Sequence, residues 1–317
     1  MTYHTINPVD LSDYMEEFEE HNQLIPGWAY SDAVVDYFHG DQTERGVQLP
    51  WSKTHGKVRL RPGEVSVWAG YNGSGKSLLL GQLMLSAMGQ GGTVCIASME
   101  MKPHVTGARM CRQASGVNIP AEGFIRDYHD WLTSKLWLYT QQSTVKFPKM
   151  LALARYCATG VLSEGKKIKI QHLVIDSLMK CGIKVDDYNT QKEFVDHLCS
   201  IAKDSQMHIH LVAHMRKSDS EFQQGDKMDI KGASEITDQV DNVFVLWRNK
   251  TKEDELVKAN PNEKIVSMSD AILSCRKQRH GEAEPKIALW FHKASMQYVG
   301  FQSARPIEFL KTHSEAA

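Results

Sequence analysis

The sequence lacks any long apolar run. No stretch approaches the ~18–20 consecutive apolar residues that a membrane-spanning helix needs, so we expect no membrane partner. Residues 1–13 also lack the basic segment and following apolar segment of a secretory signal. These absences lead us to expect a cytoplasmic protein.

An excess of one charge is missing too. The 37 lysines and arginines are balanced by 38 aspartates and glutamates, which gives a formal net charge of -1. Many nucleic-acid-binding proteins are strongly basic, and this chain is not. Any contact with phosphate groups would therefore depend on a local basic surface rather than on the field of the whole molecule.

The cysteines carry no recognisable metal or redox pattern. None of the 6 cysteines forms a C-x-x-C pair or a cysteine–histidine cluster with zinc spacing, and the 14 histidines are dispersed. We expect reduced, mostly buried thiols and no metal site built from cysteine or histidine.

What is present is typical of a globular α/β protein. The 317 residues, 42% of them hydrophobic, can form one large domain with an appendage or two small domains. From residue 64 onward, short apolar segments of strand type alternate with helical patterns. The strand patterns cover residues 65–69, 93–99, 136–139, 172–175 and 208–213. The helical patterns cover residues 76–88, 104–115, 148–159 and 190–204.

This alternation predicts a mostly parallel, twisted sheet with helices on both faces. Later strand patterns, with no helical pattern between them, predict an antiparallel extension formed by residues 243–247, 271–275 and 286–291. Polar stretches predict loops at residues 39–57, 221–229 and 250–269. We expect an N-terminal linker over residues 1–62, a main domain over 63–305 and a tail over 306–317.

The strongest motif is a phosphate-binding loop at residues 70–77. It matches G-x-x-x-x-G-K-[ST] at every required position, after a predicted strand and before a predicted helix. Its glycines let backbone N–H groups point at phosphate oxygens, and the helix N-terminus adds partial positive charge. Lys76 is expected to reach the β- and γ-phosphates, and Ser77 to bind Mg²⁺. The predicted nucleotide-binding residues are Gly70, Asn72, Gly73, Ser74, Gly75, Lys76, Ser77 and Leu78.

Asp176 follows the apolar strand pattern at residues 172–175. An acidic residue at the carboxyl end of a buried strand beside the phosphate-binding loop can hold Mg²⁺ directly or through water. We therefore predict a metal site formed by Ser77 and Asp176. The alternative role for Asp176 is the N-cap of a following helix.

Two further polar residues follow predicted strands. Glu100 comes after residues 93–99, where a carboxylate near the γ-phosphate could orient and deprotonate the attacking water. His214 ends the strand pattern at 208–213, where it could bond the γ-phosphate and move a following loop. From position alone, each could equally be a surface residue at a strand end.

A basic segment at residues 276–281 follows the strand pattern at 271–275. It lies far in sequence from the phosphate-binding loop. A cation that stabilises transition-state charge can be supplied by a neighbouring subunit. The alternative is a solvated hairpin with basic residues.

Together, in this order, these features resemble the RecA-like motor domain of DnaB-family replicative helicases, a group that includes phage helicase-primases and the mitochondrial helicase Twinkle. The resemblance covers residues 60–300. Residues 61–64 resemble the family's entry to its first motif, and residues 98–101 resemble the segment whose glutamate is the catalytic base. Residues 174–176 and 212–214 match the Walker B motif and the motif that senses the γ-phosphate. The resemblance implies a RecA-like P-loop core that uses ATP, or another NTP or dNTP, with Mg²⁺.

The resemblance also implies contacts beyond one chain. Residues 229–241 are similar to the motif that lines the central pore, in which Lys231, Gly232 and Ser234 would grip the backbone of single-stranded DNA. Without the resemblance, the preferred interpretation of this segment is a loop followed by a helix N-cap. Lys277 and Arg279 match the family's K-x-R pair, which acts on the nucleotide of the next subunit. The pattern therefore requires a homo-oligomer, in this family usually a six-membered ring.

The chain departs from the family before residue 62. That segment is too short for a primase domain, so a separate primase or loader is a candidate partner. The helical pattern at residues 11–18 resembles a linker helix that docks on the adjacent subunit, and the alternative is packing on its own core. The setting expected is a bacterial or phage-infected cell.

The function implied is an ATP-dependent hexameric replicative helicase that moves 5′ to 3′ on single-stranded DNA and unwinds duplex. The first alternative is a RecA-like recombinase or repair ATPase, which forms open filaments and exchanges strands. The second is a helicase loader or related ATPase switch, which controls assembly with little motor activity.

Overall fold

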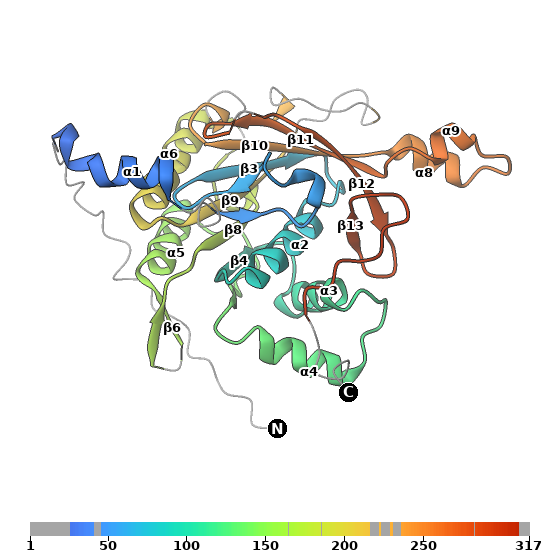
Figure 1. Ribbon diagram of the computed structural model, residues 1–317, viewed down its shortest axis with the longest axis horizontal. Helices are drawn as coiled ribbons and strands as arrows, with labels where there is room; N and C mark the ends of the chain where they lie inside the picture. The colour runs from blue at the N-terminus through green and yellow to red at the C-terminus, as the bar shows by residue number, and fades with distance from the viewer. Residues whose placement is uncertain are drawn as a thin grey trace.

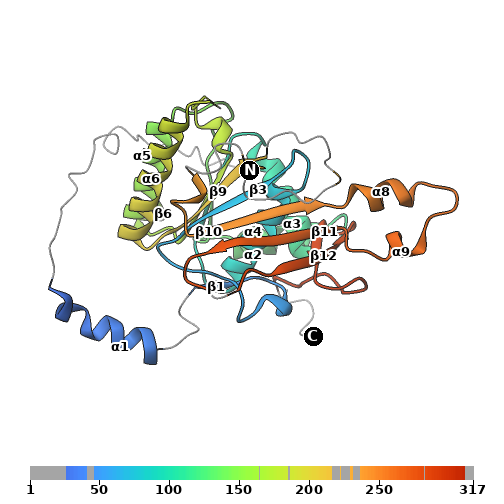
Figure 2. The ribbon, with the colours of Figure 1, turned by 90° about the horizontal axis from the view of Figure 1, so that it is seen from above.

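The computed structural model describes residues 26–40, 46–163, 165–184, 186–215, 222, 229–230, 236–281 and 283–310. Within them, the main sheet has nine strands in the order β13-β12-β11-β10-β3-β9-β8-β4-β5 (Figures 1 and 2). Six strands are parallel: β3 (Val65–Gly70), β4 (Val94–Ser98), β5 (Leu136–Leu138), β8 (His172–Asp176), β9 (His208–His214) and β10 (Asn242–Arg248). The antiparallel extension consists of β11 (Ala271–Gln278), β12 (Lys286–His292) and β13 (Gln297–Val299).

Helices cover both faces of this sheet, which confirms the predicted α/β fold. One face carries α2 (Lys76–Gly89), α3 (Pro103–Ser115) and α4 (Glu122–Trp131), and the other carries α5 (Phe147–Thr159) and α6 (Tyr188–Ser205). Successive residues of a strand point to opposite faces. Val67 therefore packs in the core with α5 and α6, whereas its neighbour Trp68 packs in the core with α2. The central strand β3 is buried along its whole length.

Smaller elements surround this core. They are η2 (Gly27–Tyr30), α1 (Ser31–His39), the β1–β2 pair (Val47–Gln48 with Arg59–Leu60), η4 (Ser52–Thr54), the β6–β7 hairpin (Val161–Ser163 with Lys166–Ile168) and η5 (Leu178–Lys180). No helix among the described residues is both long and apolar enough to cross a membrane.

The loop predicted at residues 250–269 is wrong. The segment contains α8 (Lys250–Leu256) and α9 (Glu263–Val266), which project from the sheet between β10 and β11 (Figure 1). Asn249 and Asn262 cap these helices by accepting backbone N–H groups, a stabilisation that the polar composition concealed. Lys252, whose side chain is 2.8 Å from Asp270, ties α8 to the start of β11.

The loop predicted at residues 39–57 is also wrong in part. It contains β1 and η4, and Leu49 and Trp51 are buried with Leu60 in the core beside α2. Trp51 Nε1 donates a hydrogen bond to the Tyr298 carbonyl at 2.7 Å. The core therefore extends across the boundary proposed at residue 62, and the division into segments stays a prediction.

Three buried histidines form a stack across β8 and β9. The rings of His208 and His210 lie 4.5 Å apart, and those of His172 and His210 lie 5.5 Å apart. Trp68 Nε1 donates to His210 Nδ1 at 3.2 Å, so that nitrogen is an unprotonated acceptor. Burial lowers the pKa of His172 to about 4 and that of His208 to about 3, and it lowers the pKa of His210 well below its ordinary value.

We predict that these histidines make the fold sensitive to acid. They are neutral when folded, whereas an unfolded chain protonates each near pH ~6.5. Below that pH the unfolded state binds more protons, so stability falls as the pH drops from ~6.5 towards 4, by about tenfold in the unfolding constant per pH unit per histidine. Denaturant titrations across this window measure the slope. His172→Gln should reduce the slope by one proton, and an unchanged slope in that variant would contradict the assignment.

Candidate functional site

Four of the predicted site residues lie in a row at one edge of the sheet. Gly70 ends β3, and its partner in β9 is His214. Asp176 ends β8, which lies on the other side of β9 and pairs with Ser98 at the end of β4. Glu100 follows β4 two residues later. Because the carboxyl ends of parallel strands share an edge, motifs 144 residues apart in sequence, from position 70 to position 214, meet at one site.

The phosphate-binding loop needs its glycines for specific reasons. Gly75 caps α2 with φ 92°, a conformation that L side chains rarely adopt. A Cβ there would also lie 2.4 Å from the Tyr298 hydroxyl oxygen, and one on Gly70 would lie 2.5 Å from the Leu246 carbonyl. The loop is thus packed tightly against β10 and β13, which fixes the amides that would face phosphate.

Lys76 is held inside this loop. Its Nζ donates to the carbonyls of Gly70 at 2.9 Å and Tyr71 at 3.0 Å, and the residue is buried. Burial lowers the pKa of Lys76 to about 8, while the nearby carboxylates of Asp176 and Glu100 oppose that shift. A buried ammonium without a bonded carboxylate is available to an anionic ligand.

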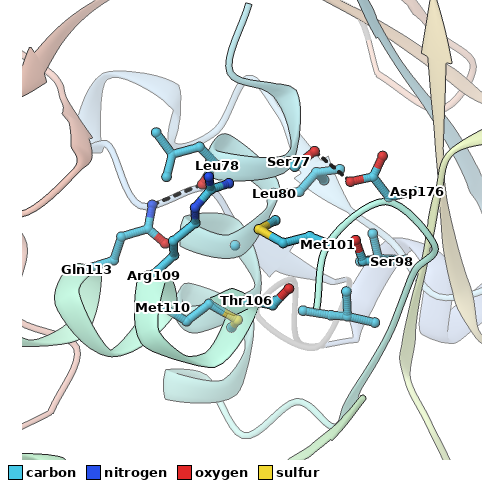
Figure 3. Close-up of a pocket in the computed structure, with 13 residues that line it drawn as sticks. Ser77, Leu78, Leu80, Ser98, Met101, Thr106, Arg109, Met110, Gln113 and Asp176 are labelled. Carbon is cyan, nitrogen blue, oxygen red and sulfur yellow. Dashed lines mark hydrogen bonds between the residues drawn. The ribbon is translucent and has the colours of Figure 1, made fainter. Parts of the chain in front are cut away.

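The two predicted metal ligands, Ser77 and Asp176, are in direct contact. Ser77 Oγ donates to Asp176 Oδ2 at 2.5 Å, as Figure 3 shows. Burial raises the pKa of Asp176, and the Ser77 hydrogen bond opposes the shift. Two adjacent protein oxygens, one on a buried carboxylate, suit Mg²⁺, which takes few protein ligands and completes its shell with water and phosphate oxygens. The residues present therefore fit this ion.

Glu100 and His214 approach each other through Ser177, which directly follows β8. Ser177 Oγ donates to Glu100 Oε1 at 3.2 Å and lies 3.3 Å from His214 Nε2. The direct separation of His214 Nε2 from Glu100 Oε1 is 3.9 Å. Ser177 is fully buried, whereas the Glu100 side chain is 43% exposed towards the cleft.

These groups surround a cleft of about 670 Å³. Lys76, Arg109 and Lys180 contribute positive charge to its wall, and Glu100 and Asp176 contribute negative charge. The wall thus carries three basic and two acidic side chains, and this excess of positive charge suits a polyphosphate. A smaller cavity lies behind it between α2 and α3, where Gln113 donates to the Leu78 carbonyl at 2.9 Å (Figure 3).

Lys277 and Arg279 lie elsewhere. Gln278 pairs with Asn242, and Asn242 with Ser66, so Arg279 lies at the amino edge of the parallel strands. From Ser66 to Gly70 the strand advances about 13 Å, and two strand spacings add about 10 Å sideways. Arg279 therefore lies far from its own phosphate-binding loop, at the opposite edge of the sheet.

Both cations contact the segment at residues 236–241. Arg279 Nη1 lies 3.2 Å from Asp241 Oδ1, and Nη2 donates to the Gln239 carbonyl at 3.0 Å. Lys277 Nζ donates to the carbonyls of Thr237 at 2.8 Å and Asp238 at 2.9 Å.

The predicted DNA-binding residues lie outside the described residues. These are Lys231, Gly232 and Ser234, and the helical pattern at residues 11–18 is also outside. The flanks of the first group are described: Ile230 pairs with Met215 directly after His214, and Ile236 is buried in the core.

Sequence reasoning missed two residues, on β10 and β13, that contact the phosphate-binding loop. Arg248 ends β10, and its Nη1 donates to the Gly73 carbonyl at 3.1 Å. Tyr298 OH donates to the Ser74 carbonyl at 3.3 Å, and its backbone makes two 2.8 Å hydrogen bonds with Gln82 in α2. Arg248 could have been found as a polar residue at the end of a strand beside β3. Tyr298 and Ser177 carry no such local signal.

Comparison with known proteins supports the fold. A family model described as AAA domain matches residues 53–220, from η4 past the end of β9. The structure described as the ATPase domain of G40P has a TM-score of 0.69 and 15% identity, covering 88% of this chain and 100% of that one. The structure of a DnaB-like replicative helicase and its interactions with primase has a TM-score of 0.67 and 14% identity, covering 88% and 67%. Among curated protein sequences nothing matches significantly. The expected resemblance to the DnaB-type motor is confirmed as a shared RecA-like P-loop fold.

We predict that nucleotide binding weakens above pH ~8. Lys76 is charged below its pKa of about 8 and loses its proton as the pH rises through that value. The affinity of the free protein for ATP should then fall by up to about tenfold per pH unit. Titration with a fluorescent ATP analogue from about pH 7 to about pH 9.5 measures this decline.

Lys76→Arg is the control for this prediction. It keeps a cation that stays charged throughout the range, so its binding, though weaker because the geometry differs, should not decline with pH. A similar decline in both proteins would show that another group titrates.

Proposed function

Because this chain belongs to the AAA domain family, we propose that it is an ATP-driven motor, a ring-forming DNA helicase that moves 5′ to 3′ on single-stranded DNA and unwinds duplex. The observation that carries the proposal is the division of the catalytic groups between two edges of the sheet. The phosphate-binding loop and Glu100 lie at the carboxyl edge, and Arg279 lies at the amino edge. One chain would thus supply both halves of a hydrolytic site without bringing them together.

The carboxyl edge would bind the nucleotide. The loop amides and Lys76 would hold the phosphates, while Ser77 and Asp176 would hold Mg²⁺. The metal ion, when bound, would neutralise charge on the β- and γ-phosphate oxygens. The buried ammonium of Lys76 would exchange its present carbonyl partners for phosphate oxygens, a stronger charge-assisted contact.

Glu100 would act as the general base. A water oxygen would bond to the γ-phosphorus, the bond from that phosphorus to the ADP oxygen would break, and the proton of the water would pass to Glu100. Arg279 and Lys277 of an adjacent copy would approach the γ-phosphate and stabilise the spreading negative charge. Arg279 would leave Asp241 to do so.

DNA movement would follow from the position of His214. It is next to Met215, which pairs with Ile230 at the start of the segment bearing Lys231, Gly232 and Ser234. Loss of the γ-phosphate would change the contacts of His214 and shift this segment along the DNA backbone. Arg279 and Lys277 contact residues 237–241 just beyond the same segment. The segment would therefore respond both to its own nucleotide and to that of the neighbour.

The region around α1 supports assembly of several copies. None of the nine residues of this helix is buried, and Val35 and Phe38 are 55% and 68% exposed. Trp28, just before the helix, is 80% exposed. Such an apolar surface costs free energy in water unless it is covered. A second copy is the occupant we propose, in a six-membered ring, with a separate primase or loader as a further partner.

Mixing experiments test the division between chains. Lys76→Ala and Arg279→Ala, each tested alone, should lower the rate of ATP hydrolysis by about 100-fold or more, because each variant lacks one half of the site. Mixed together, they should regain ATPase activity, since an intact carboxyl edge can meet an intact Arg279 from another chain. A coupled phosphate-release assay measures this recovery.

The matched control mixes Lys76→Ala with Glu100→Gln. Both changes lie at the carboxyl edge, so no combination of chains restores a complete site and no recovery is expected. If Arg279→Ala kept full activity, or if an isolated monomer hydrolysed ATP at the full rate, the proposed arrangement would be excluded.

A forked DNA substrate tests the motor activity. The wild-type chain should displace the annealed strand with ATP and Mg²⁺, and comparison with dTTP gives the nucleotide preference. Lys76→Ala should not displace it. ATP hydrolysis without displacement would favour a loader-type switch. Open filaments in electron micrographs, with strand exchange, would favour a recombinase.

A further inference from the structure

Ser177 lies between Glu100, the proposed general base, and His214, which would sense the terminal phosphate. Its hydroxyl donates to Glu100 Oε1 at 3.2 Å and is 3.3 Å from His214 Nε2. Within the described part of the chain, no other hydrogen-bond donor contacts the Glu100 carboxylate. The 3.9 Å between His214 Nε2 and Glu100 Oε1 is too long for a direct hydrogen bond.

The direction of these bonds follows from the proton count. An ionised carboxylate only accepts, so the single hydroxyl proton of Ser177 is given to Glu100. Ser177 Oγ can then only accept from His214, which places a proton on Nε2 of that histidine. The order is His214 to Ser177 to Glu100, with each group donating to the next.

Burial makes Ser177 a suitable anchor. It is fully buried, whereas the Glu100 side chain is 43% exposed and would otherwise sample several rotamers. A hydrogen bond from a rigid donor to one carboxylate oxygen restricts Glu100 and leaves the other oxygen available for water. Such a bond to a charged group is among the stronger ones in proteins.

We propose that Ser177 is a positioning residue, whose hydroxyl aligns the Glu100 base and links it to His214. The proposal rests on the function proposed above. When His214 turns to a phosphate oxygen, Ser177 Oγ loses its donor while its bond to Glu100 remains. The base is therefore aligned in both states, but its hydrogen-bond network differs between them.

Replacing Ser177 tests this role. Ser177→Ala should lower kcat for ATP hydrolysis by about 10- to 100-fold, the effect of losing one hydrogen bond to a charged group. The KM for ATP and the binding of a fluorescent ATP analogue should stay within about twofold, because the lost bond does not hold the nucleotide. Ser177→Cys keeps similar volume but donates weakly, so it should also lose kcat.

The matched control is Ser98→Ala at the end of β4. Its hydroxyl is buried beside the same site and has no hydrogen-bond partner among the residues that the structure describes. This variant removes the same atoms two residues from Glu100 and should keep kcat within about twofold of wild type. Equal losses of kcat in Ser98→Ala and Ser177→Ala would mean a packing effect and would overturn the proposal.

A double-mutant cycle distinguishes a shared hydrogen-bond network from an effect of packing. If Ser177 and His214 act in one network, the double variant Ser177→Ala/His214→Ala should lose much less kcat than the product of the two single losses. Strictly multiplicative losses, or a Ser177→Ala variant with wild-type kcat, would overturn the Ser177 proposal alone, provided Glu100→Gln is inactive. A wild-type chain without ATPase activity would overturn the proposed function as well.

Discussion

The parallel pairing of β3, β9, β8 and β4 is the constraint on which the site depends. Each of these strands brings its carboxyl end to the same edge, and the order of the strands sets which residues are neighbours there. Because β9 lies between β3 and β8, His214 is placed between the phosphate-binding loop and Asp176. A slip of register in any one strand would break this row and bury its polar ends among apolar side chains. The buried strands thus fix the register from which the chemistry follows.

Strands β10 and β13 also contact the phosphate-binding loop, from a side other than β9. Tyr298 in β13 touches the loop through its hydroxyl and α2 through its backbone, while Arg248 at the end of β10 bonds the carbonyl of Gly73. Arg248 and Tyr298 do not line the cleft, so these contacts brace the loop from its far side. A backbone held in advance loses little entropy when the ligand arrives, which favours tight and well-oriented binding. Strands β10 and β13, which come late in the chain, therefore stabilise the phosphate-binding loop near its beginning.

Local patterns in the sequence were sufficient for the core and for the phosphate-binding loop. Strands such as residues 172–175 are short apolar runs. Residues 70–77 match the full G-x-x-x-x-G-K-[ST] motif, which is specific to phosphate-binding loops. What escaped prediction has two causes: local caps inside a polar segment, and contacts between residues distant in sequence. The helices at 250–256 and 263–266 are held by Asn caps and by the pair of Lys252 with Asp270. Ser177 contacts Glu100 and His214 only because β4 and β9 lie on either side of β8, and the residues next to Ser177 in sequence do not predict these contacts.

The placement of the two groups of residues at opposite edges of the sheet also sets how many complete sites an assembly would contain. A contact that joins the carboxyl edge of one copy to the amino edge of the next is head-to-tail, and it leaves one edge of each kind unmatched at the ends of any open row. An open row of n copies then contains n − 1 complete sites, whereas a closed circle contains n. Closure would therefore add one hydrolytic centre without adding a chain, and specific activity per copy would rise with completeness of the circle rather than with concentration alone.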